Sequence, residues 1–150
     1  MDNTLLKFHH FGLAVPKPDS ARMWLTKLGY QIGETVFDSG QNVYLALCWH
    51  ETQPPVEIIW PGTEGGPIDA LVRQHEFGVV YHLSYETHDL AGALSQFKHD
   101  GLRVACISRP KAAPLFGGRK VSFYNVMGMG LVEILELECG TDSCAAEAPS

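Results

Sequence analysis

The sequence of 150 residues predicts an α+β fold in which two tandem βαβββ modules form a curved eight-stranded mixed sheet. An internal repeat is the first observation behind this prediction, because a repeated unit sets the whole architecture. His10 and His82 each stand in an extended stretch that is followed by an amphipathic segment and a glycine. The spacing from His10 to Gly29 equals the spacing from His82 to Gly101. The two halves of the chain are therefore expected to fold alike.

The second observation is that each half closes on almost the same four residues. Val56-Glu57-Ile58-Ile59 ends the first half and Val132-Glu133-Ile134-Leu135 ends the second. The interval from histidine to glutamate is slightly longer in the second half, which a longer loop around Pro110 to Gly118 explains. The repeat therefore predicts that Glu57 and Glu133 occupy equivalent places.

In the first half, apolar periodicity predicts one helix and four strands. The strand that carries His10 runs from Phe8 to Val15. Gly29 can take the positive φ that ends the following helix, whose apolar face is made of Ala21, Trp24, Leu25 and Leu28. Three further strands are expected at Tyr30 to Phe37, Val43 to Trp49 and Val56 to Trp60.

The second half repeats this order. The strand from Val79 to Glu86 carries His82, and the helix after it has an apolar face made of Leu90, Ala93, Leu94 and Phe97. Strands are then expected from about Leu102 to Ser108, from Arg119 to Val126 and from Leu131 to Leu137. A short helix is expected from Pro67 to His75, since proline suits the first helical turn. We expect a single domain, with module one at about 6–61, a linker at 62–77, module two at about 78–138 and a tail at 139–150.

Charge and composition argue against several classes of partner. The formal net charge is −6, from 11 Lys and Arg against 17 Asp and Glu, so a nucleic-acid partner is not expected. No apolar run approaches the roughly 18 residues that span a bilayer, and the first residues lack a secretory signal, so no membrane partner is expected. No CxxC motif occurs, and reduced thiols in a cytoplasmic protein are expected for Cys48, Cys106, Cys139 and Cys144.

Four polar residues interrupt apolar strands at repeat-related places, namely His10, Glu57, His82 and Glu133. A carboxylate among aliphatic residues in a central strand is costly to bury unless another charge compensates it. Side chains alternate across a strand, so one residue per strand can point into a shared concavity. Two imidazoles and two carboxylates suit a borderline divalent cation, Zn, Ni, Co, Mn or Fe, better than Ca. The sheet is therefore expected to surround a metal site with these four ligands.

Taken singly, each of the four residues favours a structural or solvent-facing role, and only their paired placement favours a metal. His9 is adjacent to His10 and is expected to point to the opposite face of the strand, as a structural residue. No role in the site is expected for the histidines of predicted loops or polar helical faces, which are His50, His75, His88 and His99.

The residues quoted above resemble the vicinal-oxygen-chelate superfamily, which includes glyoxalases, bleomycin resistance proteins and dioxygenases. His10-Phe11-Gly12-Leu13-Ala14-Val15 is similar to their opening strand, and Gly130-Leu131-Val132-Glu133 is similar to their last metal-binding strand. Three further segments resemble methylmalonyl-CoA epimerase and its relatives. They are Val56 through Trp60-Pro61, Gly65-Gly66-Pro67-Ile68 and Tyr81 through Glu86. The resemblance covers roughly Phe8 to Leu137. It implies paired modules around a divalent metal, the same four ligands and a homodimer.

The resemblance also implies residue roles, some of which this sequence lacks. In the epimerases two acid/base groups act on opposite faces of a carbon. One matches Glu133, and the other is a glutamate before the third strand, where Asp38 is the carboxylate present here. The second strand also lacks the arginine by which glyoxalase I holds glutathione. Lys111 and Arg119 stand in a loop that resembles one of epimerase-like proteins, and either hold an anionic substrate or are solvated loop charges.

Together these features predict a divalent-metal-dependent isomerase/epimerase or lyase that transfers a proton at a carbon α to a carbonyl or thioester. Glu133 is the first candidate for the base and Glu57 the second. The expected partner is a small-molecule carbonyl or acyl-thioester substrate. One alternative is a non-catalytic protein that sequesters a small molecule, as drug-resistance proteins do. Another is a ring-cleaving dioxygenase with Fe(II), against which the fourth ligand argues.

Overall fold

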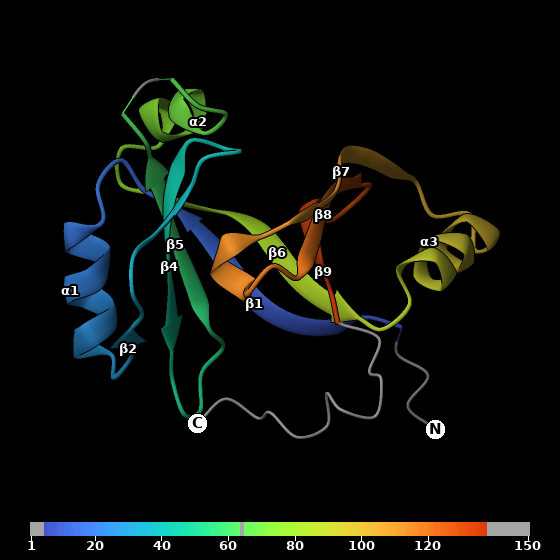
Figure 1. Cartoon of the computed structure of the whole chain (residues 1–150), viewed down its shortest axis with the longest axis horizontal. Coiled ribbons are helices and arrows are strands. Elements are labelled where there is room, and N and C mark those ends of the chain that lie inside the picture. Colours follow the sequence, from blue (N-terminus) through green and yellow to red (C-terminus); the bar gives the residue numbers. More distant parts are fainter. Residues whose placement is uncertain (1–4, 64, 138–150) are drawn as a thin grey trace.

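The computed structural model describes residues 5–63 and 65–137, and its centre is one continuous sheet (Figure 1). The strand order is β2-β4-β5-β1-β6-β9-β8-β7, and β3 pairs with β4. The strands of the first half are β1 Lys7–Ala14, β2 Gln31–Ile32, β3 Val36–Asp38, β4 Val43–Trp49 and β5 Val56–Pro61. Those of the second half are β6 Val79–Thr87, β7 Val104–Ala112, β8 Lys120–Val126 and β9 Gly130–Glu136. The helical elements are α1 Asp19–Lys27, α2 Asp69–Gln74, α3 Leu90–His99 and the 3₁₀ turn η1 Pro114–Phe116. The tail expected at 139–150, with Cys139 and Cys144, lies outside the described residues.

The two halves have the same topology, as the repeat predicts. In each half the first strand lies parallel to the last, β1 beside β5 and β6 beside β9. Gly12, two residues after His10, pairs with Glu57. Ser84, two residues after His82, pairs with Glu133. β1 and β6 pair antiparallel and join the two halves. The tandem modules and the mixed sheet are therefore confirmed, with both glutamates in the same register.

The described sheet has nine strands instead of the predicted eight, because one predicted strand is interrupted. The segment from Tyr30 to Phe37 divides into β2 and β3, which pair with β4 in registers that differ by one residue. At the break, Gly33 donates its N–H to the Leu47 carbonyl, and an added Cβ would lie only 2.2 Å from that oxygen. A bulge of this kind bends a strand and ends its regular pairing.

β7 is longer than predicted and includes the beginning of the expected loop. It continues to Ala112 through Pro110, where the pairing with β8 shifts register between Ser108 and Lys111. Proline is tolerated at such an irregularity because the ladder needs no N–H there. Lys111 therefore belongs to a strand and not to a loop.

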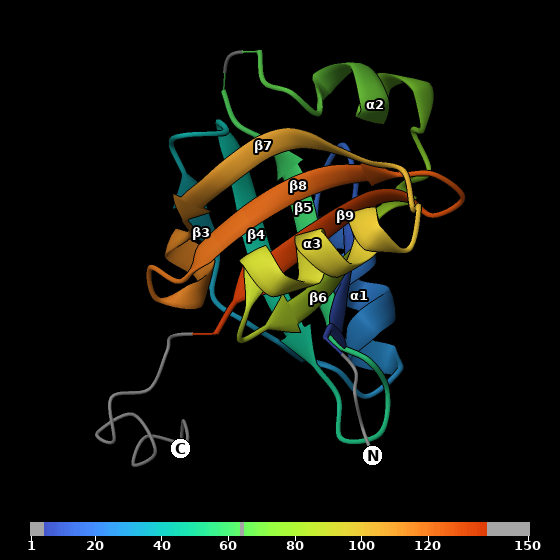
Figure 2. The ribbon, with the colours of Figure 1, turned by 90° about the vertical axis from the view of Figure 1, so that its right-hand side faces the viewer.

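The long helices lie at opposite ends of the molecule (Figure 1). Leu25 of α1 packs on a buried cluster that includes Cys48 and Ile58. In Figure 2, α3 lies across β8 and β9, where Leu90 and Leu94 pack against Tyr124, Val132 and Ile134. The predicted apolar face of α1 is too wide, since Trp24 and Leu28 are 68% and 51% exposed. The edge strand β2 beside α1 has two residues and covers little of the helix. No helix in the described part of the chain is long and apolar enough to cross a membrane.

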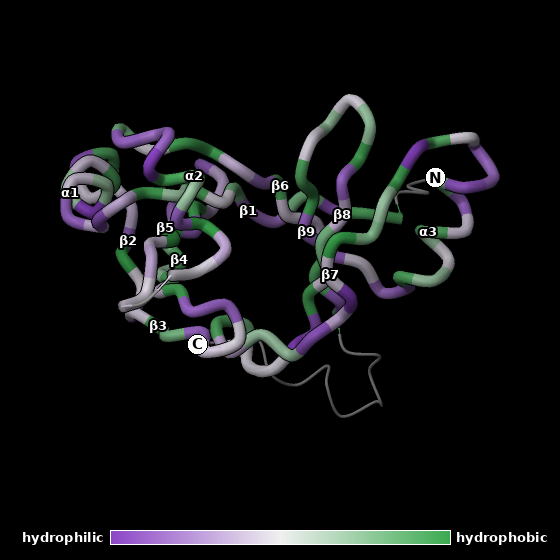
Figure 3. The backbone as a smooth tube through the Cα atoms, turned by 90° about the horizontal axis from the view of Figure 1, so that it is seen from above, coloured by the Kyte–Doolittle hydropathy of each residue, from purple (hydrophilic) through white to green (hydrophobic). Residues whose placement is uncertain are grey.

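The sheet curves around a concave side, which Figure 3 shows from above. The 3₁₀ turn η1 of the second half lies against β3 and β4 of the first half. Near α2, Ile68 and Val72 pack on Ala14, Val43 and Ile59. The concave side is thus partly closed by segments from both halves.

Candidate metal centre

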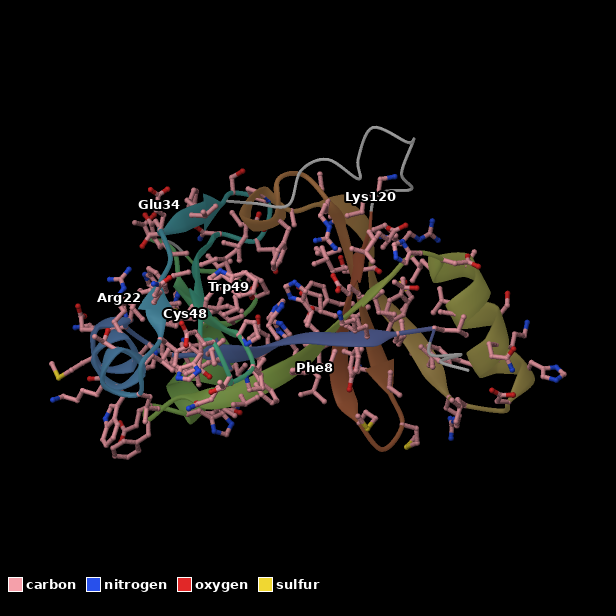
Figure 4. All side chains as sticks on the ribbon, turned by 90° about the horizontal axis from the view of Figure 1, so that it is seen from below. Phe8, Arg22, Glu34, Cys48, Trp49 and Lys120 are labelled. Carbon is pink, nitrogen blue, oxygen red and sulfur yellow. The ribbon has the colours of Figure 1, made fainter. Side chains whose placement is uncertain are left out.

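A β-bulge in β1 turns His9 and His10 to the same side of the sheet. The pairing with β6 shifts register between Phe8 and His10, which leaves His9 as the extra residue. Phe8 packs on Phe11, with ring centroids 4.9 Å apart, whereas the His9 ring lies 6.1 Å from Trp49. Figure 4 shows Phe8 and Trp49 on opposite sides of β1. The prediction that His9 points away from His10 is therefore wrong, because strict alternation holds only in a regular strand.

A second bulge stands at the repeat-related place in β6. The pairing with β1 shifts register there, because His82 pairs with Gly12 and Val80 with Leu13, so Tyr81 is the extra residue. The rings of Tyr81 and His82 are neighbours, with centroids 4.5 Å apart. Each half thus directs two adjacent side chains into the concave side.

The four residues expected as ligands converge on one point of the concave side. Nε2 of His10 lies 3.3 Å from Oε2 of Glu57 and 3.4 Å from Oε1 of Glu133. Nε2 of His82 lies 3.9 Å from Oε1 of Glu57. Ligand atoms of His10, His82 and Glu133 all lie within 4.8 Å of one another. These three groups are close enough to share one ion, and Glu57 lies beside both histidines.

The burial and hydrogen bonding of these side chains fit a divalent cation. All four residues are buried, and His10 is fully enclosed. Nε2 of His10 and both ring nitrogens of His82 are buried without a hydrogen-bond partner in the described part of the chain. Buried polar atoms are normally paired, so such nitrogens need another explanation. An imidazole nitrogen whose lone pair faces carboxylates can coordinate a Zn, Ni, Co, Mn or Fe ion together with them.

Without a cation, burial favours the neutral form of each group. Burial, and after it Asp38, raises the pKa of Glu57 to about 8. Burial and the neighbouring Glu57 raise the pKa of Glu133 to about 8, against the opposing influence of His10 and a serine hydroxyl. Burial lowers the pKa of His82 to about 3 and also lowers that of His10. A divalent cation would reverse the shifts of the carboxyl groups, because it favours their ionised form.

Gly12 and Ser84 stand at equivalent places in the two halves and serve the centre differently. A Cβ on Gly12 would lie between 2.2 and 2.5 Å from three atoms of the His82 ring. Glycine therefore leaves the space that this imidazole fills. Ser84 is fully buried and donates a hydrogen bond of 2.8 Å to Oε1 of Glu133. That hydroxyl fixes the position of the Glu133 carboxylate.

Two adjoining cavities lie on the side of the two carboxylates. The narrow one, of about 20 Å³, has Glu57 and Glu133 in its wall, and the larger one has a volume of about 510 Å³. Their common walls are formed by Asp38, Gln41, Tyr81, Val121 and Phe123. The larger cavity is mostly apolar, with Ile68, Leu71, Ile107 and Leu131 in its wall. A small molecule in the larger cavity would therefore reach toward the candidate metal centre.

The charged residues that the resemblance suggested for substrate binding or acid/base catalysis have different surroundings. Lys111 lines the larger cavity. Arg119 is not among the residues described in either wall, because its guanidinium binds the Glu136 carbonyl at 3.1 Å and Oε2 of Glu86 at 3.4 Å. Asp38 lines both cavities. Its carboxylate accepts hydrogen bonds from the backbone N–H of Gly40 at 2.9 Å and from the side chain of Gln41 at 3.0 Å.

The sequence reasoning did not identify several residues that shape the centre. Gly12 and Ser84 carried a signal in the sequence, since each follows a candidate ligand histidine by two positions; in the structure each pairs with a candidate ligand glutamate. His9 and Tyr81 carried none, because a bulge depends on how two strands pair.

Comparison with known families assigns the chain to a superfamily. Residues 9–123 match the family described as the glyoxalase/bleomycin resistance protein/dioxygenase superfamily. The chain belongs to this superfamily. The matched range of the superfamily includes His10, Glu57 and His82.

Relatives of this superfamily member include methylmalonyl-CoA epimerases. The ethylmalonyl-CoA/methylmalonyl-CoA epimerase of Cereibacter sphaeroides is 27% identical over 108 residues, which cover 70% of this chain and 78% of the relative. The crystal structure of methylmalonyl-CoA epimerase from Mycobacterium tuberculosis has a TM-score of 0.75 at 18% identity and covers 97% of both chains. A variant of the Streptomyces coelicolor methylmalonyl-CoA epimerase, in complex with 2-nitronate-propionyl-CoA, has a TM-score of 0.69 at 18% identity. This match covers 91% of this chain and 100% of the other. These structural matches show the predicted glyoxalase-like fold.

Proposed function

We propose that this protein is a divalent-metal-dependent enzyme that transfers a proton at a carbon α to a carbonyl or thioester, as an isomerase/epimerase or a lyase. The observation that carries the proposal is the convergence of two buried imidazoles and two buried carboxylates, with both carboxylates in the wall of a narrow cavity that adjoins one of about 510 Å³. The epimerase relatives support an acyl-CoA thioester as the substrate class.

His10, Glu57, His82 and Glu133 would hold the cation. A cation bound there supplies a Lewis acid for the carbonyl oxygen of the substrate, which acidifies the neighbouring C–H bond. The apolar side chains of the larger cavity, such as Ile107 and Leu131, would hold the organic part of the substrate and exclude water. Lys111, in the same wall, would attract an anionic group of that substrate.

Glu133 is the proposed base, and Glu57 is the second candidate. Both carboxylates line the narrow cavity, so an α-carbon that enters it comes close to either. In the proposed reaction the C–H bond breaks, its electron pair forms a double bond to the carbonyl carbon, the carbonyl π pair moves onto the oxygen, and the proton goes to the carboxylate. Ser84 supports Glu133 in this role, because its hydroxyl holds Oε1 at 2.8 Å and leaves the other oxygen free of that bond.

Inversion at the carbon requires a second acid/base group, and Asp38 is our candidate. β3 carries Asp38 in the first half of the chain, whereas β9 carries Glu133 in the second half. Asp38 lines both cavities and is fixed by Gly40 and Gln41. We expect Asp38→Asn to retain exchange of the α-proton but to lose inversion of the stereocentre.

The test is exchange of the α-proton with solvent. Metal-loaded protein is incubated in D₂O with acyl-CoA thioesters and α-hydroxy thioesters, and deuterium uptake is followed by NMR. Glu133→Gln keeps an oxygen for the cation but loses the base, so exchange should fall by roughly 10²–10⁴-fold. The metal content of the same sample is the control. Full exchange by a metal-replete Glu133→Gln protein would transfer the role to Glu57 or Asp38.

A protein that sequesters a small molecule is the second candidate, and the apolar wall of the larger cavity favours it. Such a protein would bind an unreactive aromatic compound tightly and would exchange no α-proton. That combination of results, across all the thioesters tested, would overturn the proposed enzyme.

A further inference from the structure

His9 and His10 are joined through their rings. Nδ1 of His9 lies 2.8 Å from Nδ1 of His10, which is a hydrogen-bond distance. The two rings are almost perpendicular, with an interplanar angle of 82°. On its other edge, the His10 ring directs Nε2 at Glu57 and Glu133. One nitrogen of His10 therefore faces the candidate metal centre while the other contacts His9.

This contact bears on which nitrogen of His10 carries the hydrogen. A neutral imidazole has one N–H and one lone pair. When Nδ1 of His10 donates to Nδ1 of His9, Nε2 of His10 keeps its lone pair for the centre. Nε2 of His10 is buried and has no hydrogen-bond partner in the described part of the chain, as a ligand nitrogen requires. His9 then carries its own hydrogen on Nε2.

Aromatic neighbours hold the His9 ring in this place. Trp49 and Phe116 contact the ring edge-on, at centroid distances of 6.1 and 5.8 Å. Phe116 also stacks on the His10 ring at 5.5 Å. Ligand histidines usually donate their second nitrogen to a carboxylate, a backbone carbonyl or water. Here a second imidazole, aimed by the bulge in β1, stands in that position.

The repeat-related ligand His82 has no equivalent support among the described residues. Its bulged neighbour is Tyr81, whose ring stands edge-on to the His82 ring at 79°. Nδ1 of His82 is buried without a hydrogen-bond partner among the described residues. The two halves of the sheet therefore differ in how they hold their ligand histidines.

We propose that His9 is a positioning residue that fixes the tautomer and orientation of His10, so that Nε2 faces the centre as a ligand. Its effect on metal binding rests on the proposed function. The tautomer of His10 does not, because His9 contacts Nδ1, on the edge of the ring that faces away from Glu57 and Glu133.

The test uses two substitutions of His9 that separate hydrogen bonding from packing. His9→Phe keeps an aromatic ring beside Trp49 and Phe116 but removes the acceptor. His9→Asn removes the ring but offers an amide oxygen near the place of Nδ1. Competition with a chromophoric chelator for Zn²⁺ should show affinity lowered roughly 10–100-fold in His9→Phe and close to wild type in His9→Asn. Wild-type affinity in His9→Phe, or an equal or larger loss in His9→Asn, overturns the proposal.

A second measurement needs no metal. NMR of the histidine ring nitrogens in the metal-free wild-type protein should find the hydrogen on Nδ1 of His10 and on Nε2 of His9. A hydrogen on Nε2 of His10 overturns the proposal. If wild-type protein binds no Zn²⁺ and His10 still carries Nδ1–H, the proposed metal centre fails while the positioning by His9 stands.

Discussion

The space that Gly12 leaves for the His82 ring leads to a prediction with a magnitude. In Gly12→Ala the new Cβ would stand 2.2 Å from Cε1, 2.4 Å from Nδ1 and 2.5 Å from Nε2 of His82. Carbon atoms in ordinary contact are about 3.5–4.0 Å apart, so the ring must move by roughly an ångström. His82 is buried, and Phe123 stands edge-on to its ring at 5.6 Å, so the ring has no solvent to move into.

Two quantities should change in Gly12→Ala. Overpacking of this kind costs about 1–3 kcal/mol of unfolding free energy. In a chain of this size each kcal/mol lowers Tm by roughly 2–4 °C. A displaced His82 should also weaken Zn²⁺ binding by roughly 10–100-fold, the usual result of misdirecting a ligand.

Thermal denaturation and chelator competition measure these changes, and a double variant is the matched control. Gly12→Ala is compared in the wild-type background and in a His82→Ala background. If the clash with the ring is the cause, alanine at this place costs little once the ring is gone, since contacting residues are not additive. The same loss of Tm in both backgrounds would refute the reasoning. So would a Gly12→Ala protein with wild-type Tm and Zn²⁺ affinity.

Three other expectations are testable, two on the candidate metal centre and one on the oligomeric state. Ser84→Ala removes the 2.8 Å hydrogen bond to Glu133 and should weaken Zn²⁺ binding in chelator competition by roughly 10–100-fold; unchanged affinity would show that Glu133 needs no such support. In metal-free protein the pKa of Glu57 and Glu133 is raised from 4.5 to about 8. Their contribution to stability is therefore fully present below about pH 4.5 and is lost as the pH rises through about 8. A bound cation removes this loss, so the gain in Tm with Co²⁺ should be larger at about pH 8 than at about pH 6, and a gain that does not grow with pH would contradict the shifts. Homodimerisation, implied by the family, predicts a dimer in sedimentation, and a monomer at working concentration would remove it.

The placement of Glu57 and Glu133 was predictable because two separate features of the repeat, the histidine-to-glycine spacing and the closing strand, agree. Equal spacing from His10 to Gly29 and from His82 to Gly101 fixed the modules. Once the modules correspond, the two glutamates must occupy equivalent rungs of the sheet. The observed pairs Gly12–Glu57 and Ser84–Glu133 are those equivalent rungs.

The places where prediction failed depend on how separate segments meet. Strict alternation put His9 on the wrong face, because the bulge in β1 arises from its pairing with β6. The apolar pattern from Tyr30 to Phe37 is continuous, yet the approach of Gly33 to the Leu47 carbonyl divides it into two strands. Trp24 fits the apolar spacing of α1 but is 68% exposed, since periodicity does not say how much sheet a helix covers.

The same limit applies to charged residues near the cavity. Lys111 and Arg119 carry the same charge and stand close in sequence, and only Lys111 lines the larger cavity. Arg119 turns instead to Glu86 and the Glu136 carbonyl. Sequence alone gives no reason to separate them, because Glu86 is distant along the chain.

Metal content is the measurement that tests the proposed centre most directly. Wild-type protein and His82→Ala are exposed to Zn²⁺, freed of unbound ion by gel filtration and examined by elemental analysis. Circular dichroism of the same samples shows whether each is folded. We expect wild type to retain a single ion per chain and folded His82→Ala to lose most of it. Wild-type protein that retains no divalent cation, or folded His82→Ala that retains as much as wild type, would contradict a metal centre built on His10, Glu57, His82 and Glu133.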